Sequence, residues 1–387
     1  MEISVQIFTG SFSEKADNWS QESIVQKLNL LYKTTQIKNA IIGWNTRPET
    51  EKIIALLKEK GTAVYLWFPV FSELDAADDF SYIIGHDNKP LSVKYVGNSN
   101  EDFKFYCPGS PANIKKIIEI FENHYAGDAY DGIFLDKIRF PSFIGGLSSV
   151  LGCFCDSCME RYNLSAVRDY FSENREQLAS CPFDYNGYSG MSYGFKNPAY
   201  QQLFDYKKQV ITDSVTQLAS YFKNRGYKTG LDLFSPFLSH FVGQDYQRLL
   251  PLADMVKPMF YRATNAPAGL PFEIEMYSSS FNNSAAARKG LAKLLGTDFD
   301  TTKINTNFIN NEIRDIKQIV TDNQLDTQIL GGIEFNYNPE IAPVTKDYIL
   351  QNLQELRGLD GIVMSWDLNS TPLENIEYLC QFLQAEG

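Results

Sequence analysis

Residues 131–141 read DGIFLDKIRFP, a short apolar run that ends in charged residues. The run Gly132–Asp136 has the length and composition of a parallel strand that is covered on both faces. Seven further runs of this kind occur along the chain: Ile3–Thr9, Ala40–Trp44, Ala63–Val70, Thr229–Phe234, Met255–Tyr261, Ile329–Phe335 and Gly361–Asp367. We therefore expect eight buried parallel strands.

Amphipathic stretches separate these runs and predict helices. Ser110 and Pro111 are typical of a helix start, because Ser caps free backbone N–H groups and Pro suits the first helical position. Residues Glu49–Lys60 predict another helix, ended by Gly61. Eight strands alternating with helices indicate an α/β protein with a (β/α)8 TIM-barrel fold. The alternative is an open doubly wound sheet, but neither a GxGxxG motif after the first strand nor a P-loop is present.

The chain has 387 residues, whereas a bare barrel needs about 250. We expect a single catalytic barrel domain over residues 1–387 that carries long loops after the third and fourth strands. These insertions cover about residues 71–109 and 137–197. Both leave from the C-terminal ends of strands, which is the face where barrels build their active sites.

Composition excludes several classes of partner. The formal net charge is −12, so phosphate backbones and anionic lipid surfaces would be repelled, and we expect neither nucleic acid nor membrane as a partner. The first ten residues read as an alternating strand rather than a secretion signal, and no apolar stretch reaches the length of a membrane helix. These observations favour a cytoplasmic protein, and they leave its oligomeric state open.

Charged and aromatic residues gather at the predicted ends of the strands. An acid at the end of an apolar strand is costly unless it is paired or used. One interpretation is that the acids pair with Lys257 and Arg139 and stabilise the barrel. The other is a glycosidase site, because two carboxyl groups cleave glycosidic bonds and aromatic faces stack on sugar rings. The acids are Asp136, Asp232, Glu334 and Asp367, and the aromatic residues are Trp44, Trp67, Tyr261 and Trp366.

Four cysteines are grouped in the insertions: Cys107, and the CxCxxC motif of Cys153, Cys155 and Cys158. Four thiolates complete a tetrahedral zinc shell that leaves no position for substrate, so we expect a structural zinc site. The alternative is a group of free or partly oxidised thiols. The three histidines lie outside the predicted strands, so a catalytic metal is not expected. No fingerprint of an organic cofactor is present.

The cysteine pattern resembles the zinc cluster of family 42 β-galactosidases, which are retaining (β/α)8 glycosidases. In that family the nucleophile is a Glu at the end of strand seven, and the acid/base is a Glu that follows Asn at the end of strand four. The resemblance therefore implies Glu334 as nucleophile. No Asn-Glu pair follows the fourth strand here, and Asp136 stands in that place. Residues 131–141 and 256–261 are also similar to uncharacterised glycosyl-hydrolase-like barrels, in which the suspected catalytic residue is an Asp of strand four.

We expect a retaining glycoside hydrolase that acts on an oligosaccharide or glycoside. Either Glu334 is the nucleophile and Asp136 the acid/base, or Asp136 is the nucleophile and Asp232 or Glu334 protonates the leaving group. The missing Asn-Glu pair favours the second arrangement. The alternative function is a carbohydrate-binding barrel without catalysis. Predicted substrate-binding residues are Arg139, Trp44, Trp67, Lys257, Tyr261, Trp366 and Asp367. The sugar, its linkage and its anomeric configuration stay open.

Overall fold

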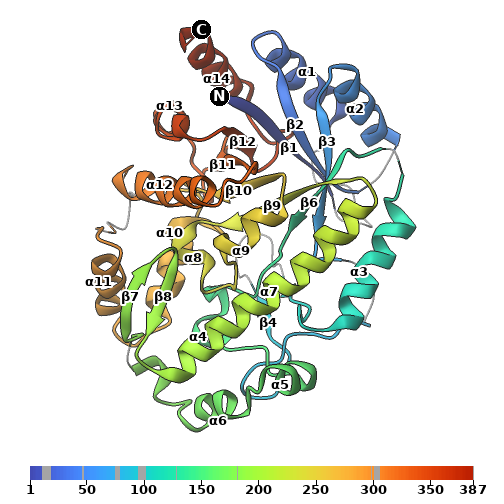
Figure 1. Ribbon diagram of the computed structural model, residues 1–387. Helices are drawn as coiled ribbons and strands as arrows, with labels where there is room; N and C mark the ends of the chain where they lie inside the picture. Colours follow the sequence, from blue (N-terminus) through green and yellow to red (C-terminus); the bar gives the residue numbers. More distant parts are fainter. Residues whose placement is uncertain are drawn as a thin grey trace.

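The computed structural model describes residues 1–10, 19–45, 48–74, 79–94, 102–127, 129–180, 182–297, 299 and 306–386. Eight parallel strands close into a barrel, in the order β1-β12-β11-β10-β9-β6-β3-β2, and helices surround it (Figure 1). These strands are β1 (Glu2–Gly10), β2 (Ile37–Trp44), β3 (Ala63–Pro69), β6 (Gly132–Asp136), β9 (Lys228–Phe234), β10 (Met255–Met259), β11 (Gln328–Glu334) and β12 (Gly361–Ser365). The predicted TIM-barrel fold is confirmed, and all eight predicted runs form its strands.

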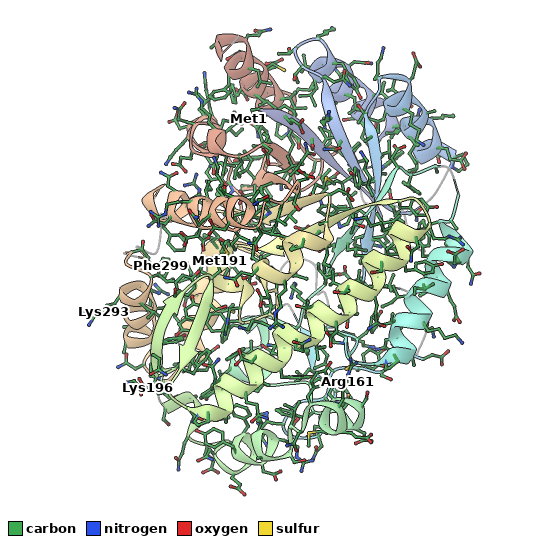
Figure 2. The ribbon with its side chains drawn as sticks, viewed as in Figure 1. Met1, Arg161, Met191, Lys196, Lys293 and Phe299 are labelled. Carbon is green, nitrogen blue, oxygen red and sulfur yellow. The ribbon has the colours of Figure 1, made fainter. Side chains whose placement is uncertain are left out.

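Helices follow the strands, as the sequence pattern predicts. Ser110 caps α3, where its Oγ accepts a hydrogen bond of 3.4 Å from the backbone N–H of Asn113, and Gly61 follows the end of α2 with a left-handed φ of 74°. The longer helices are α1 (Gln21–Tyr32), α2 (Pro48–Glu59), α3 (Pro111–His124), α7 (Pro198–Asn224), α10 (Leu270–Ser279), α11 (Ser284–Leu294), α12 (Thr306–Asp322), α13 (Lys346–Glu355) and α14 (Leu373–Glu386). Side chains fill the space between these helices and the barrel (Figure 2). In the described part of the chain, none of the helices has the length and apolar character needed to cross a lipid bilayer.

Alternation along the strands divides the buried side chains into two groups. Ile133 and Leu135 of β6 belong to the large apolar core that includes residues of the helices. Phe134 lies between them in sequence and belongs to a second, smaller core. Because successive side chains of a strand point to opposite faces, this second group fills the interior of the barrel. Its members are Ile41, Tyr65, Phe134, Met255, Leu330 and Val363.

The same alternation predicts which residues lie above this interior core. Asp136 is two positions beyond Phe134, and Lys257 is two positions beyond Met255, so both belong to the inward-facing set. Glycine at position 230 gives Phe134 its space, because a Cβ there would lie 2.5 Å from the ring. The barrel thus has an apolar floor with polar residues above it, at the C-terminal ends of the strands.

The two insertions contain most of the remaining elements and contact each other. In Figure 1 β4, α4, α5 and α6 lie together at one end of the molecule. The backbone N–H of Phe154 donates to the carbonyl of Ile84 at 2.8 Å, which joins the two insertions directly. After β3 come β4 (Ser92–Lys94) and β5 (Asp102–Lys104); after β6 come α4 (Leu147–Val150), α5 (Asp156–Tyr162), α6 (Ser165–Glu173), β7 (Tyr185–Ser189) and β8 (Ser192–Phe195). Two short helices, α8 (Pro236–Ser239) and α9 (Tyr246–Leu249), follow β9.

Candidate active site

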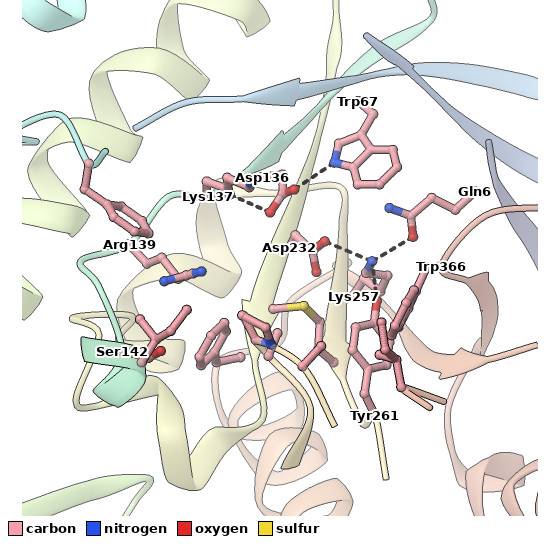
Figure 3. A pocket seen from close by; sticks show the side chains of 18 residues that line it. Gln6, Trp67, Asp136, Lys137, Arg139, Ser142, Asp232, Lys257, Tyr261 and Trp366 are labelled. Carbon is pink, nitrogen blue, oxygen red and sulfur yellow. Dashed lines mark hydrogen bonds and ion pairs between the residues drawn. The ribbon is translucent and has the colours of Figure 1, made fainter. Parts of the chain in front are cut away.

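A cavity of about 340 Å³ opens at the C-terminal ends of the barrel strands. Its walls come from β1, β3, β6, β9 and β10, and from the segments that follow these strands and β11 and β12 (Figure 3). It brings together seven of the residues that the sequence singled out: Trp67, Asp136, Arg139, Asp232, Lys257, Tyr261 and Trp366. Polar, aromatic and charged groups therefore meet in one cavity above the apolar interior of the barrel.

Asp136 is the last residue of β6, and both of its carboxylate oxygens accept hydrogen bonds. Oδ2 accepts from the indole Nε1 of Trp67 at 2.8 Å, and Oδ1 accepts from the backbone N–H of Lys137 at 2.5 Å. Lys137 has a left-handed φ of 53°, and its ammonium group pairs with Glu73 of the other insertion. The turn after β6 therefore fixes the Asp136 carboxylate in the cavity, between two N–H donors.

Asp232 lies on β9, the neighbour of β6 in the barrel. The two strands pair up to Leu135 and Leu231, so Asp136 and Asp232 each follow the last pair in register. Residues that pair in register on parallel strands point to the same face, and both aspartates line the cavity. Two carboxyl groups therefore occupy adjacent strand ends in a single site.

Lys257 on β10 holds Asp232 in a buried network. Its Nζ lies 2.9 Å from Asp232 Oδ2 and donates to Gln6 Oε1 and to the Tyr261 hydroxyl, each at 2.9 Å. The other carboxylate oxygen of Asp232, Oδ1, has no hydrogen-bond partner in the described part of the chain. One oxygen of this acid is therefore fixed and the other is free to carry a proton.

Burial and neighbouring charges set the protonation of this network. Burial raises the pKa of Asp232 to about 7, and the negative charge of Asp136 adds to the rise, while Lys257 opposes it. Burial alone would lower the pKa of Lys257, but Asp232 and Tyr261 outweigh this effect and raise it above its ordinary value. Lys257 thus stays charged at neutral pH, and Asp232 exchanges a proton near neutrality.

Arg139 forms part of the wall of the cavity next to Ser142 (Figure 3). Its guanidinium lies 4.6 Å from the ring centroid of Phe234 and 5.0 Å from that of Phe105. Burial lowers the pKa of Arg139, while Glu273, Asp136 and Asp232 oppose that change. A positive group therefore lines the same cavity as the two aspartates.

Glu334 does not line the cavity, although it ends β11. Its side chain is fully buried, and Oε1 accepts from the backbone N–H groups of Ala263 and Thr264, both at 2.9 Å. The Thr264 hydroxyl donates to Oε1 at 2.7 Å, and the Tyr348 hydroxyl donates to Oε2. Burial raises the pKa of Glu334, and these hydrogen bonds oppose the rise. The carboxylate holds the segment that follows β10.

Two other predicted residues also lie outside the lining of the cavity. Asp367 accepts from the backbone N–H groups of Phe8 and Asn369, each at 3.0 Å, and so fixes the turn after β12. Trp44 packs edge-on against Trp67, with ring centroids 5.5 Å apart. It supports the ring of Trp67 from behind.

Sequence reasoning missed Gln6, which lines the cavity and accepts from Lys257. A signal was available, because Gln6 is a polar residue within an apolar strand. It also missed Glu273 of α10, which is fully buried behind the cavity wall. The Oε1 atom of Glu273 accepts from Ser142 Oγ and from the backbone N–H of Ala268, each at 3.0 Å. The sequence around Glu273 gives no sign of this contact.

The four cysteines lie together where the two insertions meet. Their sulfur atoms are all within 4.8 Å of one another, and no disulfide joins them. The distances from Cys107 to Cys158 and to Cys155 are 3.4 and 3.6 Å, close to the separation of about 3.8 Å in a tetrahedral site with Zn–S bonds of about 2.3 Å. The backbone N–H of Ile84 donates to Cys153 Sγ at 3.3 Å, as expected around a thiolate ligand. This cluster could hold a metal ion.

No family model matches the sequence, and no curated protein matches it. Solved structures with a similar fold include α-L-fucosidase isoenzyme 2 from Paenibacillus thiaminolyticus, at a TM-score of 0.51 and 10% identity over 99% of this chain. A β-galactosidase from Rahnella sp. R3 is similar at a TM-score of 0.50 and 14% identity, again over 99% of this chain. The chain spans about half the length of these two structures, 49% and 56%. The likeness shows a shared barrel fold, and the resemblance to family 42 β-galactosidases stays a prediction.

Proposed function

We propose that this chain is a retaining glycoside hydrolase, with Asp136 as nucleophile and Asp232 as acid/base. The observation that carries the proposal is that both aspartates line one cavity on adjacent strands. Asp136 accepts two N–H hydrogen bonds there, whereas Asp232 pairs with Lys257 and has a raised pKa. Glycosidases need one carboxylate that is ionised and one carboxyl group that is protonated. The similar solved structures are named as glycosidases, which agrees with this chemistry. We also propose that residues 1–387 form one catalytic domain.

The proposed first step uses both aspartates. The Asp136 carboxylate attacks the anomeric carbon, while Asp232 gives its proton to the glycosidic oxygen and the bond between them breaks. The ammonium of Lys257, 2.9 Å away, stabilises the negative charge that remains on Asp232. In the second step water attacks the anomeric carbon, Asp232 takes the proton from this water, and Asp136 leaves. Two inversions give net retention of configuration.

Aromatic residues would bind the sugar beside this pair. Trp67, Tyr261 and Trp366 line the same cavity as the aspartates. Each presents an apolar ring on which the C–H face of a sugar can stack. In this proposal Trp44 and Asp367 support the site from behind, and Glu334 fixes the loop after β10.

A structural zinc ion would join the two insertions. Cys107, Cys153, Cys155 and Cys158 provide four ligands, so the coordination shell would be closed to substrate. Glycine is required at position 109 beside this cluster, because a Cβ there would lie 2.8 Å from Cys158 Sγ. The ion would hold residues of both cavity walls in place, and it takes no part in bond cleavage.

A panel of aryl glycosides and oligosaccharides tests the proposed function. Hydrolysis should occur with at least one member, and NMR of the first product should show the same anomeric configuration as the substrate. Asp136→Asn and Asp232→Asn should each lose most of the activity on that substrate while they keep the melting temperature of the wild type. If sugars bind but no glycoside is hydrolysed, the chain is a carbohydrate-binding barrel instead.

A further inference from the structure

Arg139 is a buried cation in the wall of the cavity. The residue is 8% exposed and lines the cavity. The rings of Phe105 and Phe234, which also line the cavity, lie 5.0 and 4.6 Å from the guanidinium carbon. These contacts fix the position of the guanidinium group and remove much of its hydration.

Most hydrogen-bond donors of Arg139 have no acceptor in the described part of the chain. A guanidinium group has five N–H donors. Among the described residues the single acceptor is the backbone carbonyl of Phe140, 3.1 Å from one terminal nitrogen, and no carboxylate lies within 4.0 Å. By contrast, buried Arg262 pairs with Glu355 at 2.6 Å and also donates to Asn352 at 3.1 Å. The described residues satisfy that buried arginine and leave Arg139 with free donors.

The acids near Arg139 do not pair with it. Asp232 Oδ1 and Glu273 Oε2 have no hydrogen-bond partner among the described residues, but neither forms an ion pair with the guanidinium. Asp232 pairs with Lys257, and Asp136 accepts from Trp67 and from the backbone N–H of Lys137. Glu273 accepts from Ser142 and Ala268 through Oε1. A charge that is buried without a paired acceptor is unfavourable. The missing acceptor is therefore expected to come from a molecule that enters the cavity.

We propose that the substrate carries a carboxylate, as a uronic acid does, and that Arg139 binds this group. The planar guanidinium and the planar carboxylate can form two parallel hydrogen bonds. This inference rests on the proposed glycosidase function for its sugar, and it adds the chemical class of that sugar. Arg139 lines the same cavity as Asp136 and Asp232, and their charges act on its pKa, so the carboxylate would be bound near the reacting bond.

Binding of acidic and neutral sugars tests the proposal without any need for hydrolysis. D-glucuronate, D-galacturonate and D-mannuronate, with short oligosaccharides of each, would be compared by calorimetry with glucose, galactose, mannose and their oligosaccharides. At least one uronate should bind about 30-fold or more tightly than its neutral parent, and Arg139→Gln should abolish that preference. Arg139→Lys should keep part of it, because the charge remains but the paired geometry is lost. Glucose 6-sulfate and glucose 6-phosphate test whether any anion satisfies the site.

Controls separate recognition from stability and from catalysis. Arg161→Gln changes an arginine of α5 that pairs with Asp213 of α7 and does not line the cavity, and it should leave every affinity unchanged. If Arg139→Gln does not fold, Arg139→Lys gives the decisive comparison. The proposal is overturned if no uronate binds better than its neutral parent, if the preference survives Arg139→Gln, or if the sulfate or phosphate binds more tightly than every uronate. Hydrolysis that Asp136→Asn leaves intact would contradict the proposed catalytic pair. The proposal that Arg139 binds a uronate would not be affected by that result.

Discussion

The indole Nε1 of Trp67 donates a hydrogen bond of 2.8 Å to Oδ2 of Asp136, on the adjacent strand of the barrel. The ring of Trp67 lines the cavity as well. One side chain can therefore stack on a sugar and orient a carboxylate.

Trp67→Phe keeps an aromatic face but removes this hydrogen bond. A hydrogen bond to a charged group contributes about 1.5–3 kcal/mol, so kcat should fall about 10- to 100-fold while KM changes little. Trp366→Phe is the matched control, since no hydrogen bond from its indole occurs in the described chain, and it should keep kcat. Steady-state kinetics of both variants check this, and equal losses in kcat would contradict the role of the Trp67 hydrogen bond.

The pH dependence of kcat/KM should reflect Asp232. Burial raises the pKa of Asp232 to about 7, and the first step needs its protonated form, which is present below that pKa. Activity should therefore fall about tenfold per pH unit above about pH 7. Tyr261, whose pKa burial raises to about 12, does not titrate in this range.

Asp232→Asn should remove this alkaline limb. Its residual activity should be higher with aryl glycosides that have acidic leaving groups, because these need no proton. A pH–rate profile of wild type and variant measures both effects. An unchanged limb in Asp232→Asn would assign the titration to another group.

Glu334→Gln should keep at least about one third of wild-type activity. The amide oxygen can accept the hydrogen bonds that Ala263 and Thr264 donate to Oε1, and the amide nitrogen can donate to the Tyr348 hydroxyl, so the loop after β10 should stay in place. Kinetics and a melting curve test the variant beside Asp136→Asn. A loss of several decades in kcat with an unchanged melting temperature would favour Glu334 as nucleophile, the role that the resemblance to family 42 β-galactosidases implies.

Strand positions and the meeting of Asp136 with Asp232 were predictable, because both follow from local sequence. Apolar runs of strand length fix which residues end at the same rim, and alternation fixes which of them point inward. That Glu334 points away from the cavity was not predictable in the same way. It depends on the N–H groups of Ala263 and Thr264 in a segment after β10, whose conformation has no signature in the sequence.

The sequence suggested that strand-end acids pair with Lys257 and Arg139, but it could not say which acid pairs with which cation. Lys257 pairs with Asp232 because β9 and β10 align these two residues in register, and register is a property of the closed barrel. Lys137 pairs with Glu73 across the two insertions, through the fold of two irregular segments. The lack of a carboxylate partner for Arg139 among the described residues depends on several segments that pack around it, so the sequence alone could not predict it.

The cysteine cluster should bind one zinc ion per chain. Cys155→Ser should lower the zinc content, measured by elemental analysis, and lower the melting temperature by at least about 5 °C, because metal binding contributes to folding free energy. Cys380→Ser is the control, since Cys380 is a buried thiol outside the cluster. Hydrogen exchange should increase in residues 79–94 and 137–160 of the first variant. Metal-free protein with the same stability as the wild type would contradict a structural ion.

Azide rescue distinguishes the two possible roles of Asp136. Asp136→Gly removes the carboxylate and leaves space beside the anomeric carbon, and kcat should fall by several decades because the covalent step is lost. If Asp136 is the nucleophile, azide can occupy this space and attack an activated glycoside directly, while Asp232 still protonates the leaving group. The product is then a glycosyl azide of inverted configuration, which NMR identifies. If Asp136 is the acid/base, azide instead attacks a covalent intermediate on another residue, and the glycosyl azide has retained configuration. Wild-type activity of Asp136→Asn on a confirmed substrate would contradict both roles, because neither a nucleophile nor an acid/base tolerates replacement by an amide.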